Sequence, residues 1–157
     1  MSEGLRAFRA FRYGATDTRQ ELSMAKPVVL VVEEDALIRM SAVHMIADAG
    51  YTVVEACNAD EAIRMLERQS DIGVVFTDIN MSGSMDGLKL AHAIRNRWPP
   101  IHLIVASGLK VQDELPENGR FILKPYTAED ITNALDELLG HKPPSTSETG
   151  CKSAEAA

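Results

Sequence analysis

The chain has 157 residues, room for one domain of ordinary size, and a net charge of −7. Its 45% apolar and 25% charged residues are typical of a soluble globular protein, which excludes a collagen-like repeat and a coiled coil. Residues 26–140 alone carry ten basic and eighteen acidic side chains, so this segment favours a divalent cation over nucleic acid as a direct ligand.

Neither a membrane span nor an export signal is expected. The longest apolar run, Val28–Val32, is too short to cross a bilayer, and the N-terminus lacks the apolar core of a secretory signal. Two cysteines, Cys57 and Cys151, are too few for a disulfide framework or a metal site. We therefore expect a cytoplasmic protein.

Two terminal segments lack the pattern of a folded domain. Residues 141–157 are rich in Pro, Ser, Thr and Ala, which predicts a disordered tail. Residues 1–25 are expected to be a flexible extension, although their stretch LRAFRAFRYG also fits a short basic helix that contacts a membrane surface or a partner. Met24, just before the first expected strand, is an alternative start of the natural chain.

Between these segments, residues 26–140 form the expected domain, in which strand and helix patterns alternate. Val28–Val32 is a continuous run of Val and Leu, typical of a parallel strand that is buried on both faces. Further strands are expected at Thr52–Ala56, Ile72–Thr77, Ile101–Ala106 and Phe121–Leu123.

Apolar residues at helical spacing lie between the strands. The first such stripe ends at Gly50, in a C-terminal capping position. Asn58 with Glu61 resembles a capping box, two prolines stop the helix Asp86–Arg97, and Thr127 caps the last helix. Strict alternation predicts an α/β fold, in which a doubly wound, five-stranded parallel sheet is covered by helices on both faces.

Chemically active side chains follow the strands, at the edge of a doubly wound sheet where ligands bind. They are Glu33, Glu34 and Asp35 after the first strand, Asp78 and Asn80 after the third, Ser107 after the fourth, and Lys124 with Pro125 after the fifth. Clustered carboxylates tolerate one another best around a hard cation such as Mg²⁺, and a lysine and a hydroxyl would complete a cradle for a phosphoryl group. The constellation fits phosphoryl transfer with one carboxylate as the nucleophile.

Four segments, VVLVVEED, FTDINMSGSMDG, VASG and FILKPYT, stand in this order at the ends of the expected strands. In combination they resemble the receiver domain of two-component response regulators, over residues 27–140. The resemblance implies a flavodoxin-like (βα)5 three-layer sandwich. It also implies a bacterial, cytoplasmic phosphoprotein that relays a signal and is not an enzyme beyond slow loss of its own phosphoryl group.

The resemblance assigns roles to single residues. Asp78 would be the phosphoacceptor, and Lys124 and Ser107 would contact the phosphoryl group that it receives. The cofactor would be Mg²⁺, with the ligands Glu33, Glu34, Asp78 and the backbone carbonyl of Asn80. Ser107 and Phe121 would form the switch, in which the ring turns inward after phosphorylation, and the Lys124-Pro125 bond would be cis.

Two departures from the family's pattern lie close to the expected site. The acidic pair is Glu-Glu where Asp is usual at the second position, and the extra methylene of Glu34 predicts weaker Mg²⁺ binding. The loop between Asp78 and Gly87 is one residue longer than the commonest form, with Ser82 in place of a frequent proline.

A third departure concerns the segment between Ser107 and Phe121. Only thirteen residues separate the two, and Pro116 lies among them, so the fourth helix is expected to be short or degenerate. The family commonly docks partners or dimerises on this surface, so a changed partner surface is expected.

Two other functions are compatible with parts of this sequence. A phosphatase of the haloacid dehalogenase type also uses an Asp nucleophile and Mg²⁺, but its second acid would fall at Asn80, which cannot act as a general acid. A pseudo-receiver that binds partners without phosphorylation is consistent with the Glu-Glu pair.

The expected partners follow from the resemblance. They are a sensor histidine kinase or a histidine phosphotransfer protein, and a phosphorylation-dependent homodimer is a further option. Nothing after residue 140 predicts an output domain, so a stand-alone receiver is expected to signal through protein contacts or by onward phosphotransfer.

Overall fold

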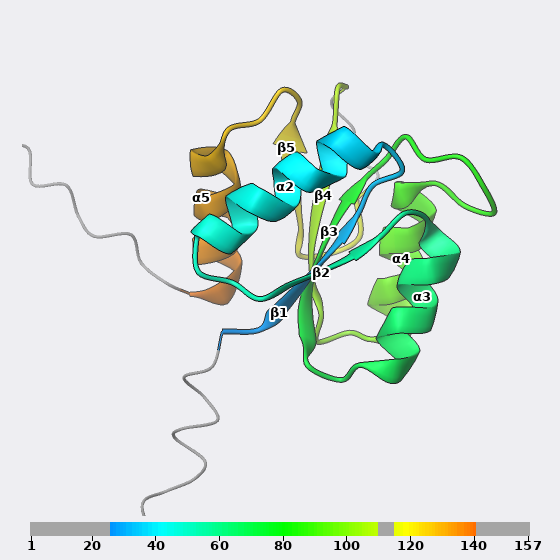
Figure 1. Cartoon of the computed structure of the whole chain (residues 1–157). Coiled ribbons are helices and arrows are strands. Elements are labelled where there is room, and N and C mark those ends of the chain that lie inside the picture. Colours follow the sequence, from blue (N-terminus) through cyan, green and yellow to red (C-terminus); the bar gives the residue numbers. More distant parts are fainter. Residues whose placement is uncertain (1–25, 110–114, 141–157) are drawn as a thin grey trace, which may run out of the picture.

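A computed structural model describes residues 26–109 and 115–140, in which strands and helices alternate (Figure 1). The elements in chain order are β1 (Val28–Val32), α2 (Ala36–Asp48), β2 (Val53–Ala56), α3 (Ala59–Arg68), β3 (Ile72–Asp78), α4 (Gly87–Arg97), β4 (His102–Ser107), β5 (Gly119–Leu123) and α5 (Ala128–Leu139).

The strands form one parallel sheet in the order β2-β1-β3-β4-β5. Figure 1 shows α2 and α5 on one face of this sheet and α3 and α4 on the other. The predicted doubly wound α/β fold with three layers is therefore confirmed. The strand order reverses between β1 and β3, and the carboxyl ends of these two strands are where such a sheet places its ligand site.

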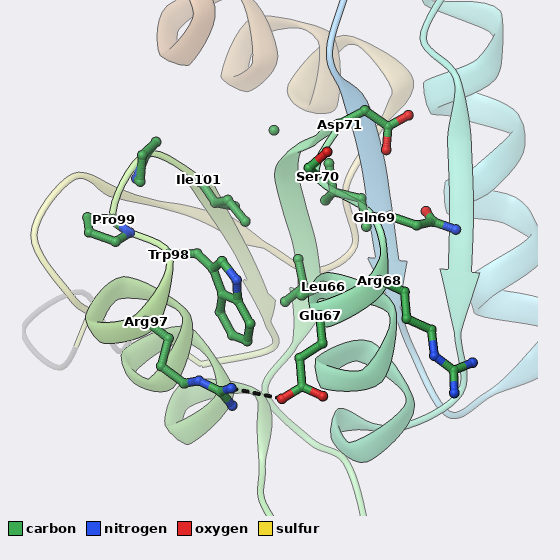
Figure 2. A pocket seen from close by; sticks show the side chains of 13 residues that line it. Leu66, Glu67, Arg68, Gln69, Ser70, Asp71, Arg97, Trp98, Pro99 and Ile101 are labelled. Atoms are coloured by element: carbon green, nitrogen blue, oxygen red, sulfur yellow. Dashed lines mark hydrogen bonds and ion pairs between the residues drawn. The ribbon is translucent and has the colours of Figure 1, made fainter.

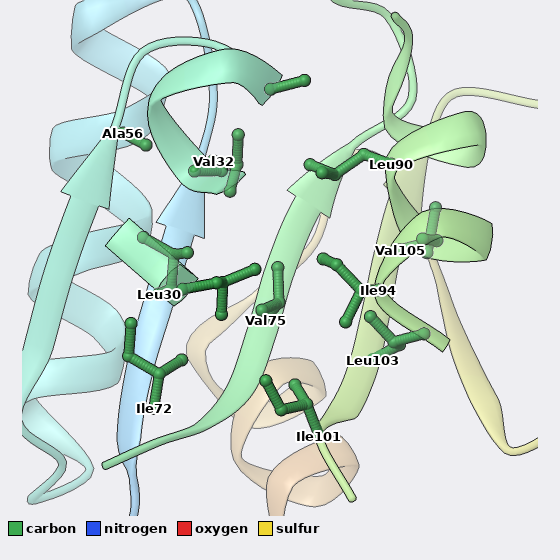
Figure 3. Packing of buried hydrophobic residues seen from close by; sticks show 14 residues of the cluster. Leu30, Val32, Ala56, Ile72, Val75, Leu90, Ile94, Ile101, Leu103 and Val105 are labelled. Atoms are coloured by element: carbon green, nitrogen blue, oxygen red, sulfur yellow. The ribbon is translucent and has the colours of Figure 1, made fainter. Parts of the chain in front are cut away.

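Alternate residues of each central strand enter two separate cores. Leu30 and Val32 of β1 pack with α3 and α4, in the cluster that also holds Val75, Ile94 and Leu103 (Figure 3). Val29 and Val31 point to the opposite face and pack with residues of α2 and α5. Because β1 is buried on both faces, it needs the continuous apolar run that its sequence has.

Polar side chains fix the first turns of the helices. Asn58 accepts a hydrogen bond from the backbone N–H of Glu61, and Thr127 caps the last helix, as predicted. Thr127 does so through a reciprocal capping box with Asp130. The Glu61 carboxylate accepts from the N–H of Cys57 rather than from Asn58, so the expected box is displaced by one residue. At the far end of α2, Gly50 has a φ of +84°, which a residue with a side chain rarely adopts.

Strand β5 is longer than the sequence predicts. It begins at Gly119 rather than Phe121, because Gly119 and Arg120 pair with Leu103 and Ile104 of β4 through their backbones. Arg120 is exposed and forms an ion pair with Glu137 of α5, so this part of the strand has no apolar pattern to reveal it.

Several sequence predictions concern residues outside the described ranges. These are the flexible extension at residues 1–25 and the disordered tail at residues 141–157. Between β4 and β5, the described residues 108–109 and 115–118 contain no helix, and residues 110–114 lie outside the description. Among the described helices, none is both long and apolar enough to cross a membrane.

Gly87 provides a test of how the fold positions the end of β3. A methyl group added there would overlap the carbonyl oxygen of Asp78 and approach Thr77 Oγ1 within 2.9 Å. We expect Gly87→Ala to lower the free energy of unfolding by about 1–3 kcal/mol, measured by urea denaturation. Gly108→Ala is the control, since within residues 26–109 and 115–140 no atom beyond its chain neighbours lies within 4 Å of the added methyl group. Equal stability of the two variants would contradict this account.

Candidate functional site

Three strands bring an acid, a second acid and a lysine together at the carboxyl edge of the sheet. Glu33 follows β1, Asp78 is the last residue of β3, and Lys124 follows β5. The Lys124 ammonium lies 2.7 Å from Asp78 Oδ2 and 3.4 Å from Glu33 Oε2. This acid–lysine cluster, Glu33, Asp78 and Lys124, joins residues that are up to 91 positions apart in the chain.

The two carboxylates of the cluster are buried. Glu33 is 4% exposed and Asp78 is 5% exposed, so water solvates neither of them well. Burial and the nearby Asp78 charge raise the pKa of Glu33, against the opposing effects of the Asp35 N–H and of Lys124. Burial alone would lower the pKa of Lys124, but its hydrogen bonds and attraction to Asp78 and Glu33 outweigh burial and raise it.

The backbone around the cluster fixes the orientation of Asp78. Its Oδ1 accepts a hydrogen bond of 3.2 Å from the N–H of Asn80, while Oδ2 is held by Lys124. The N–H of Lys124 donates to the carbonyl of Ser107, which joins the ends of β5 and β4. The Lys124–Pro125 bond is cis, as predicted.

Ser107 lies at the end of the neighbouring strand and is not part of the cluster. It is buried, and its Oγ accepts a hydrogen bond from the N–H of Leu109. Phe121 is half-buried and pairs through its backbone with Val105 of β4. The two residues predicted as a switch therefore occupy the adjacent strands β4 and β5, and β4 pairs with the strand that ends at Asp78.

Glu34 points to a different neighbour. Its exposed carboxylate accepts hydrogen bonds from both the N–H and the Oγ of Ser82, in the loop between β3 and α4, and these bonds lower the pKa of Glu34. Within residues 26–109 and 115–140, no three His, Cys, Asp or Glu side chains form a group that could hold a metal ion. The structure thus joins Glu33 and Asp78 through Lys124, whereas the Glu34 carboxylate is bound by Ser82.

Arg39 and Tyr126 support the site and were not identified from the sequence. The guanidinium of Arg39 donates to the carbonyl of Glu33 at 2.8 Å and pairs with Glu55, so it fixes the backbone of the acidic pair. The ring of Tyr126 packs edge-on against Phe76, and burial raises the pKa of its hydroxyl. Arg39 could have been noticed because it lies one turn into the helix that follows the acidic pair, within reach of that pair.

A hollow of about 610 Å³ lies at the opposite edge of the sheet, between the ends of α3 and α4 (Figure 2). Arg97 forms an ion pair with Glu67 there and stacks its guanidinium over the ring of Trp98, which packs against the core. No residue that the sequence singles out for phosphoryl chemistry lines this hollow. The candidate site is therefore the carboxyl edge.

Removing the lysine tests the electrostatics of the cluster. We expect Lys124→Met to lower the free energy of unfolding at pH 7 by about 1–3 kcal/mol, since two buried carboxylates lose their counter-charge while partial exposure screens the effect. Because the pKa of Lys124 is raised in the folded protein, its ion pairs contribute fully to the free energy of unfolding below pH 10.5. This contribution is lost as the pH rises through the pKa that Lys124 has in the folded state. The loss in the variant should therefore shrink at high pH in urea titrations.

Lys89→Met is the matched control for this change. Its ammonium lies 3.8 Å from Asp86 on the surface, so its removal should change stability by less than about 0.5 kcal/mol. A Lys124→Met protein as stable as the wild type at pH 7 would contradict the proposed charge balance.

Known proteins of one family are similar to this chain. The family model "Response regulator receiver domain" matches residues 29–136. The chain is 32% identical over 125 residues to the sensor kinase CckA of Brucella abortus, covering 76% of this chain and 13% of that protein. It is 34% identical over 107 residues to the two-component response regulator ORR27 of Oryza sativa, covering 66% of this chain and 17% of that protein.

Both relatives are therefore several times longer than the part that this chain matches. Among solved structures, the response regulator TrrA of Thermotoga maritima, in complex with Mg²⁺-BeF, shares the fold with a TM-score of 0.66. It is 22% identical, and the match covers 72% of this chain and 99% of that one. With the family model matching most of its length, the chain belongs to the response regulator receiver domain family of two-component systems.

Proposed function

We propose that this receiver accepts a phosphoryl group on Asp78 from a phosphohistidine of a sensor kinase or a histidine phosphotransfer protein. The observation that carries the proposal is the environment of Asp78, a buried carboxylate at the carboxyl edge of the sheet with an ammonium at 2.7 Å. The phosphorylated domain then signals through protein contacts or by onward transfer to another histidine.

In the proposed step, an Asp78 oxygen attacks the phosphorus of the phosphohistidine. A P–O bond forms while the P–N bond breaks, and the bonding electron pair returns to the imidazole nitrogen of the donor. Lys124 stays beside Asp78 and balances the charge that the phosphoryl oxygens bring into a buried acidic site. The N–H of Asn80 already binds the other Asp78 oxygen and keeps the carboxylate oriented.

The donor set of the site suits a hard cation. Its ligands would be the carboxylates of Glu33, Glu34 and Asp78 and the backbone carbonyl of Asn80, which are all oxygen donors of the kind that Mg²⁺ prefers. When bound, Mg²⁺ supplies positive charge to the phosphoryl oxygens. The Mg²⁺-BeF complex of the similar TrrA structure supports this cofactor.

Ser107 and Phe121 are proposed to report the modification. The Ser107 hydroxyl accepts a bond from Leu109, and by rotating it can donate a hydrogen bond to a phosphoryl oxygen on Asp78 instead. Ser107 lies on β4, which pairs with the strand that carries Phe121. A shift of the Ser107 hydroxyl would therefore be passed to the Phe121 ring on the neighbouring strand.

An apolar groove beside the cluster is the proposed docking face for the donor protein. It has a volume of about 520 Å³ and is lined by Leu37, Ile38, Ser41, Met45, Lys124, Pro125 and Tyr126. Leu37 is 73% exposed and the adjacent Ile38 is 40% exposed, and a contiguous exposed apolar patch of this kind marks an interaction site. Because Lys124 belongs to both the groove and the cluster, a helix seated here would bring its phosphohistidine to Asp78.

Acetyl phosphate tests the acceptor directly. With Mg²⁺, the wild-type protein should gain one phosphoryl group in its intact mass, and Asp78→Asn should gain none because the nucleophilic oxygen is lost. Asp71→Asn removes an exposed acid at the opposite edge and should leave the adduct unchanged. An unmodified wild type, or an equal adduct on Asp78→Asn, would refute the proposal and favour a pseudo-receiver.

The docking face is tested by comparing two donors. Leu37→Asn should slow transfer from a phosphorylated histidine kinase by about tenfold, because it removes an exposed apolar anchor from the groove. Transfer from acetyl phosphate should stay at the wild-type rate, since that small donor needs no docking face. Equal slowing with both donors would show that the variant damages the site itself.

A further inference from the structure

Two serines connect the loop between β3 and α4 to its neighbours. Ser82 donates to Glu34 Oε2 through its N–H at 2.8 Å and through its Oγ at 2.6 Å. Ser84 Oγ donates to Asp60 Oδ1 at 2.7 Å, in the first turn of α3. Between the serines, Gly83 has a φ of +111°, a conformation that glycine adopts without strain. The loop is therefore anchored on both sides.

The contact with Glu34 depends on the length of that side chain. Both donors of Ser82 converge on the same carboxylate oxygen, and hydrogen bonds to a charged acceptor are the strong ones. An aspartate at this position would be shorter by one C–C bond, about 1.5 Å, and would not reach Ser82 from the same backbone. The contact with both donors therefore needs Glu at position 34 and a hydroxyl side chain at position 82.

We propose that Ser82 is a positioning residue that holds Glu34 away from the acid–lysine cluster, so that Mg²⁺ can recruit Glu34 only by breaking the Ser82 contact. The inference rests on the proposed Mg²⁺ site and adds a mode of regulation to it. The proposal is based on two contacts: Glu33 and Asp78 both bind Lys124, while Glu34 is bound by Ser82 in the loop between β3 and α4. Metal binding is thereby coupled to the release of the loop that follows the acceptor.

The strength of the contact sets the expected effect. A hydrogen bond to a charged group stabilises by an amount that corresponds to roughly tenfold in an equilibrium constant, and exposure to water reduces this effect. Ser82→Ala removes the hydroxyl and keeps the N–H, whereas Ser82→Pro removes both donors. The two variants should therefore bind Mg²⁺ about threefold and about tenfold more tightly than the wild type.

Calorimetric titration of the full chain with Mg²⁺ alone measures these affinities. The control is Ser84→Ala, which removes a hydroxyl of similar geometry from the same loop without touching Glu34, and it should bind Mg²⁺ as the wild type does. In a Glu34→Asp background, Ser82→Ala should have no further effect, because the contact is already out of reach. Unfolding curves confirm that each variant is folded.

A second measurement follows the contact itself. The amide resonance of Ser82 should shift on addition of Mg²⁺ to the wild type, because its N–H loses the Glu34 acceptor, and should shift alike in Ser84→Ala. Affinities of both Ser82 variants equal to or below that of the wild type would overturn the inference. An equal gain in Ser84→Ala, or an unchanged Ser82 resonance at saturating Mg²⁺, would also overturn it.

The acetyl phosphate assay separates this failure from that of the proposed function. If Asp78 takes up the phosphoryl group with Mg²⁺ and the Ser82 variants bind Mg²⁺ as the wild type does, only the role of Ser82 is wrong. If no variant binds Mg²⁺ and no adduct forms, both the role of Ser82 and the proposed function are wrong.

Discussion

The attraction between one lysine and two buried carboxylates is the constraint on which this site depends. Glu33 and Asp78 lie at the carboxyl ends of adjacent strands and would repel each other in a poorly solvated environment if Lys124 did not contact both of them. The lysine comes from the far side of the sheet, so the charge balance links β1, β3 and β5. A group that adds negative charge at Asp78 must disturb this balance, which is a physical basis for a signal.

The sequence was sufficient to predict the elements that bury their own apolar faces. The run Val28–Val32 predicted a strand with the observed bounds, because a strand covered on both faces has apolar residues at every position. The start of β5 was missed because Gly119 and Arg120 join the sheet through backbone pairing alone. Propensity and periodicity carry no information about such pairing.

The candidate site also has a part that the sequence pattern predicts and a part that it does not. Glu33, Asp78 and Lys124 could be placed together because parallel strands end at one edge, and the structure brings them into contact. The contact of Glu34 with Ser82 could not be predicted, since it depends on the path of a loop and on one methylene of side-chain length. Such contacts depend on side-chain rotamers, which a pattern of residue types does not specify.

Amide NMR with Mg²⁺ and beryllium fluoride, a mimic of the phosphoryl group, can show whether Ser107 senses a group on Asp78, as we propose. The N–H of Leu109 donates to Ser107 Oγ, so its resonance reports the position of that hydroxyl. We expect the resonances of Asn80 and Leu109 to shift in the wild type and to stay unchanged in Asp78→Asn. Identical shifts in the two proteins, or a Leu109 resonance that does not move when Asn80 does, would contradict it.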